Sequence, residues 1–374
     1  MLTALFTFTG LVVWALLILM VAGQVLTRGP VRRWLEASAR FPYWQWTRCR
    51  LAGGLMTLLR RLGVGRARRV APEVVTAFRT ARLGEFKDLR AVMHELDALP
   101  TVQRGLAAIG LKSIFEVPTA DVHLRKSPYT DRLQRPYYYV PGVPARTFHD
   151  PAGFDWVKPL EDAYPEIKEE LLGILHRSAA GFKAYMNETQ ERMQGWNTFN
   201  FFFQGRRFEE NCRACPRTAD LLESLPRFER DHIMFSALNP HAHIPPHTGP
   251  MNGIVRGHLA LVAPPGSFIK VGADERTWEE GKVLVFDDSY VHEVWNHSDH
   301  VRIVLFMNFW HPCFAEEEIE VLTRFRAAYS QSPLGRVHED NQAAQRAHDL
   351  ALQAMAAAKA AAAPAAEAAL AGTR

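Results

Sequence analysis

Hydrophobic and polar positions alternate with a period of two residues between Arg227 and Pro312, a pattern typical of β-strands. The strands that the alternation predicts cover residues 232–238, 254–263, 268–272, 282–287, 291–295 and 301–309. Pro264-Pro265-Gly266 and the run from Asn296 to Asp299 separate strands as turns. Several short strands at close spacing predict a β-sandwich, jelly roll or barrel.

Helical spacing replaces this alternation outside the strand region. Apolar residues recur at helical positions through residues 72–106, which predicts a helix there. Alanine dominates residues 343–371, and Pro364 interrupts them, which is typical of a helical stretch that ends in a frayed tail. We assign no chemistry to this tail.

The amino-terminal region is uncharged. The 25 residues from Leu2 to Leu26 include no Asp, Glu, Lys, Arg or His. A helix of that length rises roughly 37 Å, which is enough to cross a hydrocarbon core of about 30 Å. A cleaved signal peptide and a buried core helix are the alternatives. No Lys or Arg precedes the run, which argues against a signal peptide, so we expect a single transmembrane anchor at residues 1–27.

A basic stretch follows the uncharged run. Eleven arginines and a single acid, Glu36, lie between Arg28 and Arg69. The positive-inside rule then places the rest of the chain in the cytoplasm, anchored in the inner or plasma membrane. Aromatic residues interleave with these arginines, which favours contact with anionic lipids, although a solvated helix or a nucleic-acid patch would show similar composition. The apolar residues 51–59 fit an interfacial, re-entrant or core helix equally well.

The overall composition is ordinary for a globular chain. The 374 residues are 48% hydrophobic and 22% charged, which excludes a wholly disordered or collagen-like protein. A mean hydropathy of −0.15 excludes a polytopic membrane protein, and four cysteines are too few for a disulfide scaffold of this size. Outside the basic stretch, acids outnumber Lys and Arg by 39 to 33. The basicity therefore belongs to the membrane surface, and we expect no nucleic-acid partner.

Histidines concentrate near the expected strands, and a pair of them stands out by context. His247 lies in a proline-rich segment that we expect to be a rigid loop, and His292 begins a strand 45 residues downstream. Two such positions can face each other across the mouth of a double-stranded β-helix, where neutral imidazoles suit a metal such as Fe(II). Arg302 lies in a strongly apolar strand and needs an anionic partner. A small dicarboxylate near the metal or an acid of the barrel could supply that partner.

These positions belong to a series of motifs that occur in one order along the chain. The motifs are Gln204-Gly-Arg-Arg207, His247-Thr-Gly-Pro250, Arg256-Gly-His-Leu-Ala-Leu261, Trp278-Glu-Glu-Gly-Lys-Val283, Phe286-Asp-Asp-Ser289, His292-Glu-Val-Trp295 and Trp310-His-Pro312. Together they resemble the aspartyl/asparaginyl β-hydroxylase family of Fe(II)- and 2-oxoglutarate-dependent dioxygenases, over roughly residues 136–329. The resemblance implies a double-stranded β-helix (jelly roll or cupin-like) with flanking helices, and hydroxylation that consumes 2-oxoglutarate and O2.

The resemblance also implies the residues that would hold iron. His247 and His292 match the iron ligands of the family. Gly249 occupies the position where most 2-oxoglutarate oxygenases place a carboxylate, and in this family a glycine there is usual. Asp288 matches an acid that would hold a water in place of that carboxylate.

Further residues match the cosubstrate site of the family. Arg302 and Ser236 match the pair that grips the distal carboxylate of 2-oxoglutarate, which suits the bidentate geometry of a guanidinium. Arg256 and His258 share one face of their expected strand and match further anion-binding positions. Trp196 matches a pocket aromatic residue.

The expected organisation has four parts. Residues 1–27 form the anchor, residues 28–134 a basic juxtamembrane and helical region, residues 135–329 the dioxygenase domain, and residues 330–374 the alanine-rich tail. The anchor and its basic flank favour the acyl chain of a membrane lipid as the substrate, hydroxylated next to the carbonyl. The alternative is β-hydroxylation of Asp or Asn side chains in a peptide or protein, because the core motifs are very close to that branch of the family. Cys212 and Cys215 form a C-x-x-C without a second such pair, and we expect a structural role for them.

Overall fold

The computed structural model describes residues 41–61, 76, 79–116, 133–136, 138–177, 183–186, 192–203 and 205–332. The expected anchor at residues 1–27 and the alanine-rich residues 343–371 lie outside the described residues, as does most of the basic stretch. Within the described ranges, no helix is both long and apolar enough to span a bilayer. Contacts divide the chain into two units, residues 1–118 with 320–337 and residues 119–319 with 338–374.

The described part of the first unit is helical. Its elements are α3 (Phe41–Arg61), α5 (Leu83–Asp97), α6 (Pro100–Ala108), the 3-10 turn η2 (Ile114–Glu116) and most of α11 (Glu316–Gln331). The single helix expected at residues 72–106 is wrong, because the chain is not helical at Ala81 and Arg82 or at Leu99. Leu99 adopts an extended conformation ahead of Pro100, and the chain therefore divides into α5 and α6 at that point.

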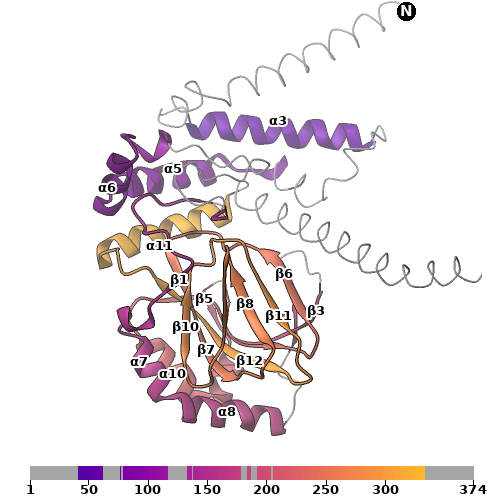
Figure 1. Ribbon diagram of the computed structural model, residues 1–374. Helices are drawn as coiled ribbons and strands as arrows, with labels where there is room; N and C mark the ends of the chain where they lie inside the picture. Colours follow the sequence, from indigo (N-terminus) through magenta and orange to yellow (C-terminus); the bar gives the residue numbers. More distant parts are fainter. Residues whose placement is uncertain are drawn as a thin grey trace, which may run out of the picture. The chain divides into compact units, whose positions relative to one another are not determined.

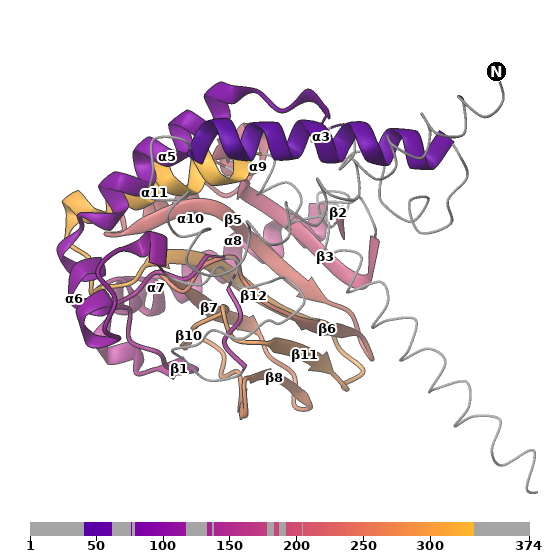
Figure 2. The same ribbon diagram turned by 90° about the horizontal axis from the view of Figure 1, so that it is seen from above.

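The second unit contains two antiparallel sheets (Figures 1 and 2). The larger sheet has the order β1-β10-β7-β12-β5-β3-β2, with β4 paired to β3, and the smaller has the order β6-β11-β8-β9. The strand bounds in the larger sheet are β1 (Phe148–His149), β2 (Lys183–Met186), β3 (Arg192–Phe203), β4 (Arg206–Arg207), β5 (Phe228–Leu238), β7 (Ile254–Val262), β10 (Val283–Phe286) and β12 (Arg302–Trp310). Those in the smaller sheet are β6 (His243–His247), β8 (Ser267–Val271), β9 (Asp274–Thr277) and β11 (His292–Asn296).

The period-two pattern correctly located six of these strands, namely β5, β7, β8, β10, β11 and β12. It missed β3, whose 12 residues contain the aromatic run Phe201-Phe202-Phe203. The proline-rich segment before Gly249, expected as a loop, is strand β6. Pro245 and Pro246 are tolerated there because β6 is an edge strand of its sheet. The mainly β, jelly-roll fold expected for this domain is confirmed.

The two faces of the larger sheet pack against different partners. One face packs against helices α7 (Val157–Asp162), α8 (Tyr164–Arg177) and α10 (Pro216–Ser224), with the short α9 (Glu209–Ala214) and η3 (Pro151–Gly153) nearby (Figure 1). The other face meets the smaller sheet, through buried side chains such as Ala260 and Val304 from one sheet and Ile269 and Val294 from the other. Alternate residues of β7 therefore point into helices and into the space between the sheets. His258 belongs to the inner set with Ala260.

Candidate active site

His247 and His292 are brought together by strand pairing. Strands β6 and β11 are antiparallel, and the Cα atoms of His247 and His292 are partners in their register. Their ring centroids are 4.0 Å apart. The 45-residue separation in sequence thus becomes direct contact, as the sequence predicted for a double-stranded β-helix.

Backbone carbonyls fix how the two imidazoles are protonated. Nδ1 of His247 lies 2.8 Å from the carbonyl oxygen of Pro245, and Nδ1 of His292 lies 2.9 Å from that of Tyr290. A carbonyl oxygen only accepts hydrogen bonds, so each Nδ1 carries the hydrogen and each Nε2 carries the lone pair. Burial lowers the pKa of His292 and keeps its ring in the neutral form that binds metals.

The Asp288 carboxylate lies where Gly249 lacks a side chain. A Cβ atom built on Gly249 would overlap this carboxylate, and the Gly249 amide donates to the Asp288 carbonyl oxygen at 2.6 Å. A longer residue at position 249 would have to displace Asp288. The glycine and the acid are therefore a complementary pair beside the histidines.

Arg256 holds the Asp288 carboxylate in this place. Its guanidinium forms an ion pair with Asp288 and also donates to the side-chain oxygen of Asn308. The same guanidinium lies 4.1 Å from the centroid of the Phe306 ring. Asn308 in turn donates to the carbonyl oxygen of Asp231. Each charge in this cluster has an opposite charge or a hydrogen bond, and the arrangement is held on three strands.

Arg302 is buried without a carboxylate among the residues that the structure describes. It is 1% exposed, and its guanidinium makes a weak donation from Nη1 to the Ser236 carbonyl oxygen at 3.5 Å. Its guanidinium lies 4.8 Å from the Trp278 ring centroid. Burial lowers the pKa of Arg302 to about 9, because no anion offsets the loss of water. The sequence analysis left two possible partners for Arg302, a small dicarboxylate and an acid of the barrel. No acid of the described residues pairs with Arg302.

Further polar atoms without partners surround Arg302. In the described part of the chain, both ring nitrogens of His258, Nε1 of Trp278 and Nε of Arg302 are buried and have no hydrogen bond. Burial, then Arg302 and Arg256, lower the pKa of His258 well below its ordinary value, so its ring is neutral. Nε1 of Trp196 donates to Oγ of Ser236 at 2.9 Å. Buried polar groups rarely remain unpaired, and this cluster has the composition of a site for a small anion.

Trp278 was not expected as a site residue, although it lies within a motif that the sequence singled out. Asn308 was also missed, because nothing around it in the sequence distinguishes it from other residues of an apolar strand. The structure brings all eight expected site residues, Trp196, Ser236, His247, Arg256, His258, Asp288, His292 and Arg302, into the space between the sheets or its rim.

A segment on the amino-terminal side of the domain ties together the loops that carry this site. Asn252, just after Gly249, accepts from the Val140 amide at 2.8 Å and donates to the Val140 carbonyl oxygen at 3.0 Å. Gln134 donates to Asp287 and to Ser289, at 3.0 Å in each case. Burial raises the pKa of Asp287 to about 8, so it is protonated at neutral pH. Next to it, Asp288 is the partner of the Arg256 cation.

The donor set fits a metal bound by two imidazoles. Nowhere in the described residues do three or more His, Cys, Asp or Glu side chains gather in a group that could hold a metal. Because each Nδ1 is engaged by a backbone carbonyl, the Nε2 atoms of His247 and His292 would be the protein ligands, with the Asp288 carboxylate nearby to orient a water. The remaining coordination positions would be open to small molecules, as Fe(II) oxygenase chemistry requires.

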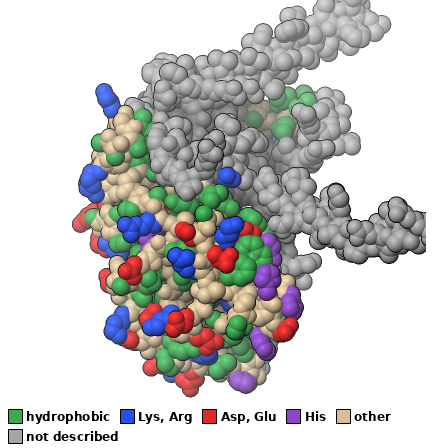
Figure 3. Space-filling view, in the orientation of Figure 1, with side chains coloured by type: hydrophobic (Ala, Val, Ile, Leu, Met, Phe, Trp, Pro, Cys, Tyr) green, Lys and Arg blue, Asp and Glu red, His purple; other side chains and the backbone are tan. Residues whose placement is uncertain are grey.

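Other residues that the sequence singled out lie apart from this site. Cys212 and Cys215 are buried in the core between the larger sheet and its helices, and burial raises the pKa of Cys212. A raised pKa disfavours the reactive thiolate, in agreement with a structural role. Figure 3 shows histidines gathered along one edge of the molecule, and His241, His297 and His300 are exposed in turns. His241 pairs there with Asp299 at 3.0 Å.

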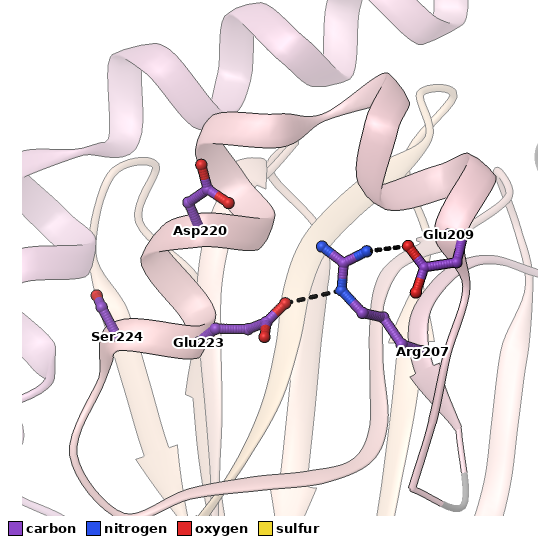
Figure 4. A pocket seen from close by; sticks show the side chains of 5 residues that line it. All are labelled: Arg207, Glu209, Asp220, Glu223 and Ser224. Carbon is purple, nitrogen blue, oxygen red and sulfur yellow. Dashed lines mark hydrogen bonds and ion pairs between the residues drawn. The ribbon is translucent and has the colours of Figure 1, made fainter.

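A surface hollow of about 530 Å³ also lies away from the histidine pair. Arg207, Glu209, Asp220, Glu223 and Ser224 line it (Figure 4). Arg207 is paired with Glu209 and with Glu223, the latter at 2.8 Å, so the arginine is already neutralised by acids of the hollow. We assign no ligand to it.

Comparison with known proteins identifies relatives of this domain. Residues 161–312 match the family described as Aspartyl/Asparaginyl beta-hydroxylase, which confirms the resemblance seen in the motifs. The human aspartyl/asparaginyl beta-hydroxylase is 38% identical over 186 residues, 48% of this chain and 24% of that protein. The ornithine lipid ester-linked acyl 2-hydroxylase of Rhizobium tropici is 36% identical over 176 residues, 44% of this chain and 60% of that protein.

The match therefore spans about a quarter of the human relative and somewhat under two thirds of the bacterial one. Among solved structures, a Pseudomonas putida prolyl-4-hydroxylase matches with 16% identity and a TM-score of 0.26, over 40% of this chain and 86% of that one. That score is too low to support an argument, and the fold assignment rests on the strand order above.

Proposed function

We propose that the protein is an Fe(II)- and 2-oxoglutarate-dependent hydroxylase, on the premise that residues 161–312 share the chemistry of the aspartyl/asparaginyl β-hydroxylase family that they match. The proposal rests on two observations taken together. His247 and His292 are paired across strands β6 and β11, and the buried Arg302 lacks an acidic partner in the described chain. A metal and a dicarboxylate would satisfy both at once. When bound, Fe(II) would supply the oxidation of a C–H bond by O2, with 2-oxoglutarate consumed as cosubstrate.

His247 and His292 would hold the metal through Nε2. The carbonyl oxygens of Pro245 and Tyr290 would orient the rings and raise their basicity as ligands, the usual second role of such contacts. Asp288, which Arg256 holds in the space beside Gly249, would accept hydrogen bonds from a water next to the two histidines. Its negative charge would offset the charge of the metal.

Arg302 would receive the distal carboxylate of 2-oxoglutarate. A guanidinium binds carboxylate through two parallel hydrogen bonds, and this partner would replace the water that Arg302 loses on burial. Ser236 would add its hydroxyl, which Trp196 orients through the 2.9 Å hydrogen bond. His258 and Trp278 would complete the pocket with donors that have no other partner in the described residues.

The match to the family implies that Arg256 binds an anionic ligand, but here Arg256 would act on the ligand site mainly through Asp288. Its guanidinium is already engaged by Asp288 and Asn308. Its first role would be to position the Asp288 carboxylate, and only its remaining donors could reach a cosubstrate or substrate.

We propose the acyl chain of a membrane lipid, hydroxylated at the carbon next to the carbonyl, as the substrate. The Rhizobium tropici relative acts, by its name, on the acyl group of ornithine lipid. The uncharged run from Leu2 to Leu26 and the arginines after it support a single-pass anchor in the inner or plasma membrane, with the domain in the cytoplasm. There the domain would meet lipid substrates, Fe(II) and 2-oxoglutarate.

The human relative supports a second candidate, β-hydroxylation of Asp or Asn side chains in a peptide or protein. Its identity to this chain, 38%, is close to the 36% of the lipid enzyme. An anchor could serve either enzyme by localising it.

Mass spectrometry of lipid extracts separates the two candidates. Extracts from cells that lack the gene would be compared with extracts from cells that carry it and from cells that carry the His292→Ala variant. We expect one lipid class to gain the mass of an oxygen atom only with the unchanged chain. Identical lipids in all three strains would reject the lipid substrate, and a protein digest of the same strains would then reveal hydroxylated Asp or Asn.

A further inference from the structure

Helix α3 (Figure 1) carries exposed residues along its whole length. The exposed residues recur every three or four positions and therefore share one face. They are Tyr43, Thr47, Arg50, Leu51, Gly54, Leu58 and Arg61. Gln45, Cys49 and Gly53, on the opposite face, are buried.

The buried face is occupied by the rest of its own unit. Cys49 packs against Ala81 and Phe86 of the neighbouring segment, and Trp46 donates from Nε1 to the Ala81 carbonyl oxygen at 3.0 Å. Residues 51–59 thus form part of an amphipathic helix that is anchored on one side. The other side is left for something else to cover.

The exposed stripe is unusually apolar for a helix of this chain. Tyr43, Leu51 and Leu58 are 53%, 54% and 47% exposed, and they are three of the four large apolar side chains in the described residues with such exposure. The fourth, Leu172, lies alone on α8 in the other unit and is 41% exposed. Single exposed leucines need no explanation, whereas an aligned set on one helix indicates a binding face.

The positive charge of α3 favours an anionic binding partner. The helix contains no Asp or Glu, and Arg50 and Arg61 are exposed on the same stripe as the leucines. Lys87 of α5 lies 5.5 Å from the ring centroid of Tyr43 and adds a positive charge beside it. Apolar side chains flanked by cations are the pattern of helices that lie in the headgroup region of anionic bilayers.

The sequence places this helix close to a bilayer. Only residues 27–40 separate the uncharged run that ends at Leu26 from the start of α3 at Phe41. If that run is inserted, the short tether keeps the stripe at high effective concentration near the lipid surface. We propose that the Tyr43–Leu51–Leu58 face of α3 docks on the surface of a bilayer with anionic headgroups. This surface is distinct from the hydroxylase site and does not depend on the proposed reaction.

Site-specific fluorescence in lipid nanodiscs tests this proposal with the full chain. Leu51→Cys and, as a matched control, Leu172→Cys would each be labelled with an environment-sensitive fluorophore, and the unchanged chain would give the background from native cysteines. Nanodiscs of phosphatidylcholine, with or without phosphatidylglycerol, would carry spin-labelled acyl chains that quench on contact. We expect about twofold quenching at position 51 in the anionic discs, little in neutral discs, and none at position 172.

A second variant tests whether the stripe acts as a unit. Adding Leu58→Asp to the labelled Leu51→Cys chain should abolish the quenching, whereas adding Leu172→Asp should leave it unchanged. Access of aqueous iodide to the label at position 51 would overturn the proposal, as would equal quenching in neutral and anionic discs. Protection from iodide without quenching by lipid would also overturn it, because a protein segment or a second copy would then cover the face.

Discussion

Arg256 and Arg302 are two arginines in similar surroundings with opposite electrostatic circumstances. Both lie on neighbouring strands of the larger sheet, and each guanidinium rests over an aromatic ring, Phe306 for Arg256 and Trp278 for Arg302. Arg256 is paired with the buried Asp288, whereas Arg302 has no carboxylate among the described residues. The fold itself supplies the anionic partner of Arg256, whereas the anionic partner of Arg302 would be a ligand.

This difference separates a positioning residue from a binding residue. A paired buried charge keeps other groups in place, and its removal leaves the partner uncompensated. A buried cation without a partner lowers the stability of the ligand-free protein, and binding of an anion offsets this cost. Stability and ligand affinity should therefore respond in opposite ways when either arginine is replaced by a neutral residue of similar size.

The largest effect is expected at the histidines, on which the whole comparison depends. His247→Ala or His292→Ala should abolish turnover of 2-oxoglutarate, because one remaining imidazole cannot hold the metal. Succinate formation in the presence of Fe(II) would measure this, with binding of Fe(II) followed separately. Retained turnover in a chain that carries both changes would refute the metal site.

The next effect concerns the arginine without a partner. Arg302→Met should raise the KM for 2-oxoglutarate about 100-fold, since the distal carboxylate loses its bidentate partner. In the absence of cosubstrate, the melting temperature of the variant should be unchanged or higher. Succinate formation at varied 2-oxoglutarate concentration measures the KM, and thermal unfolding measures the melting temperature. An unchanged KM would show that Arg302 serves the structure only.

The paired arginine should show the reverse response. Arg256→Met leaves the buried Asp288 without its cation, which should lower the free energy of unfolding by about 3 kcal/mol. The KM for 2-oxoglutarate should change much less than it does in Arg302→Met. Chemical denaturation of the two variants side by side decides the comparison, and equal stability would contradict it.

A smaller effect is expected where Gly249 meets Asp288. Gly249→Ala places a methyl group in the space of the Asp288 carboxylate and should displace it. We expect Fe(II) affinity to fall about 10- to 100-fold, as for other changes next to metal ligands. Titration of Fe(II) under anaerobic conditions measures this, and Gly253→Ala, next to Phe314, is a control with crowding outside the metal site.

The smallest effect concerns two neighbouring histidines, the half-buried His149 and the buried His311, for which no ligand is proposed. Burial lowers the pKa of both His149 and His311 to about 4, and their ring centroids are 5.5 Å apart. The unfolded chain binds protons at these sites below about pH 6.5, whereas the folded chain does not until about pH 4. Their contribution to stability is therefore complete above pH 6.5 and is lost as the pH falls toward 4.

The comparison variant for this pair is His149→Phe. Its melting temperature should fall less steeply than that of the unchanged chain between pH 6.5 and 4, because one titrating group is gone. Parallel melting curves would show that acid sensitivity arises elsewhere. At neutral pH the imidazoles are uncharged, and neither should influence binding of 2-oxoglutarate.

Much of the fold was predictable because strand alternation is a local property. Each of the six predicted strands shows its period within five to ten residues. The motifs singled out His247, His292 and Asp288, and the apolar strand around it singled out Arg302. Strand β6 escaped prediction, because two prolines argue against a strand unless its place at a sheet edge is known. Trp278 escaped because its ring acquires a role only when it packs under Arg302.

The sequence by itself determined six of the strands, the resemblance to a known family and the identity of the candidate ligands, since these depend on residue type and short-range spacing. Tertiary structure decided which charges have partners. Nothing near Arg256 or Arg302 in the chain distinguishes a paired guanidinium from an unpaired one. Asp288 lies 32 residues from Arg256, and only the pairing of β7 with β10 and β12 brings the acid to one arginine and not to the other.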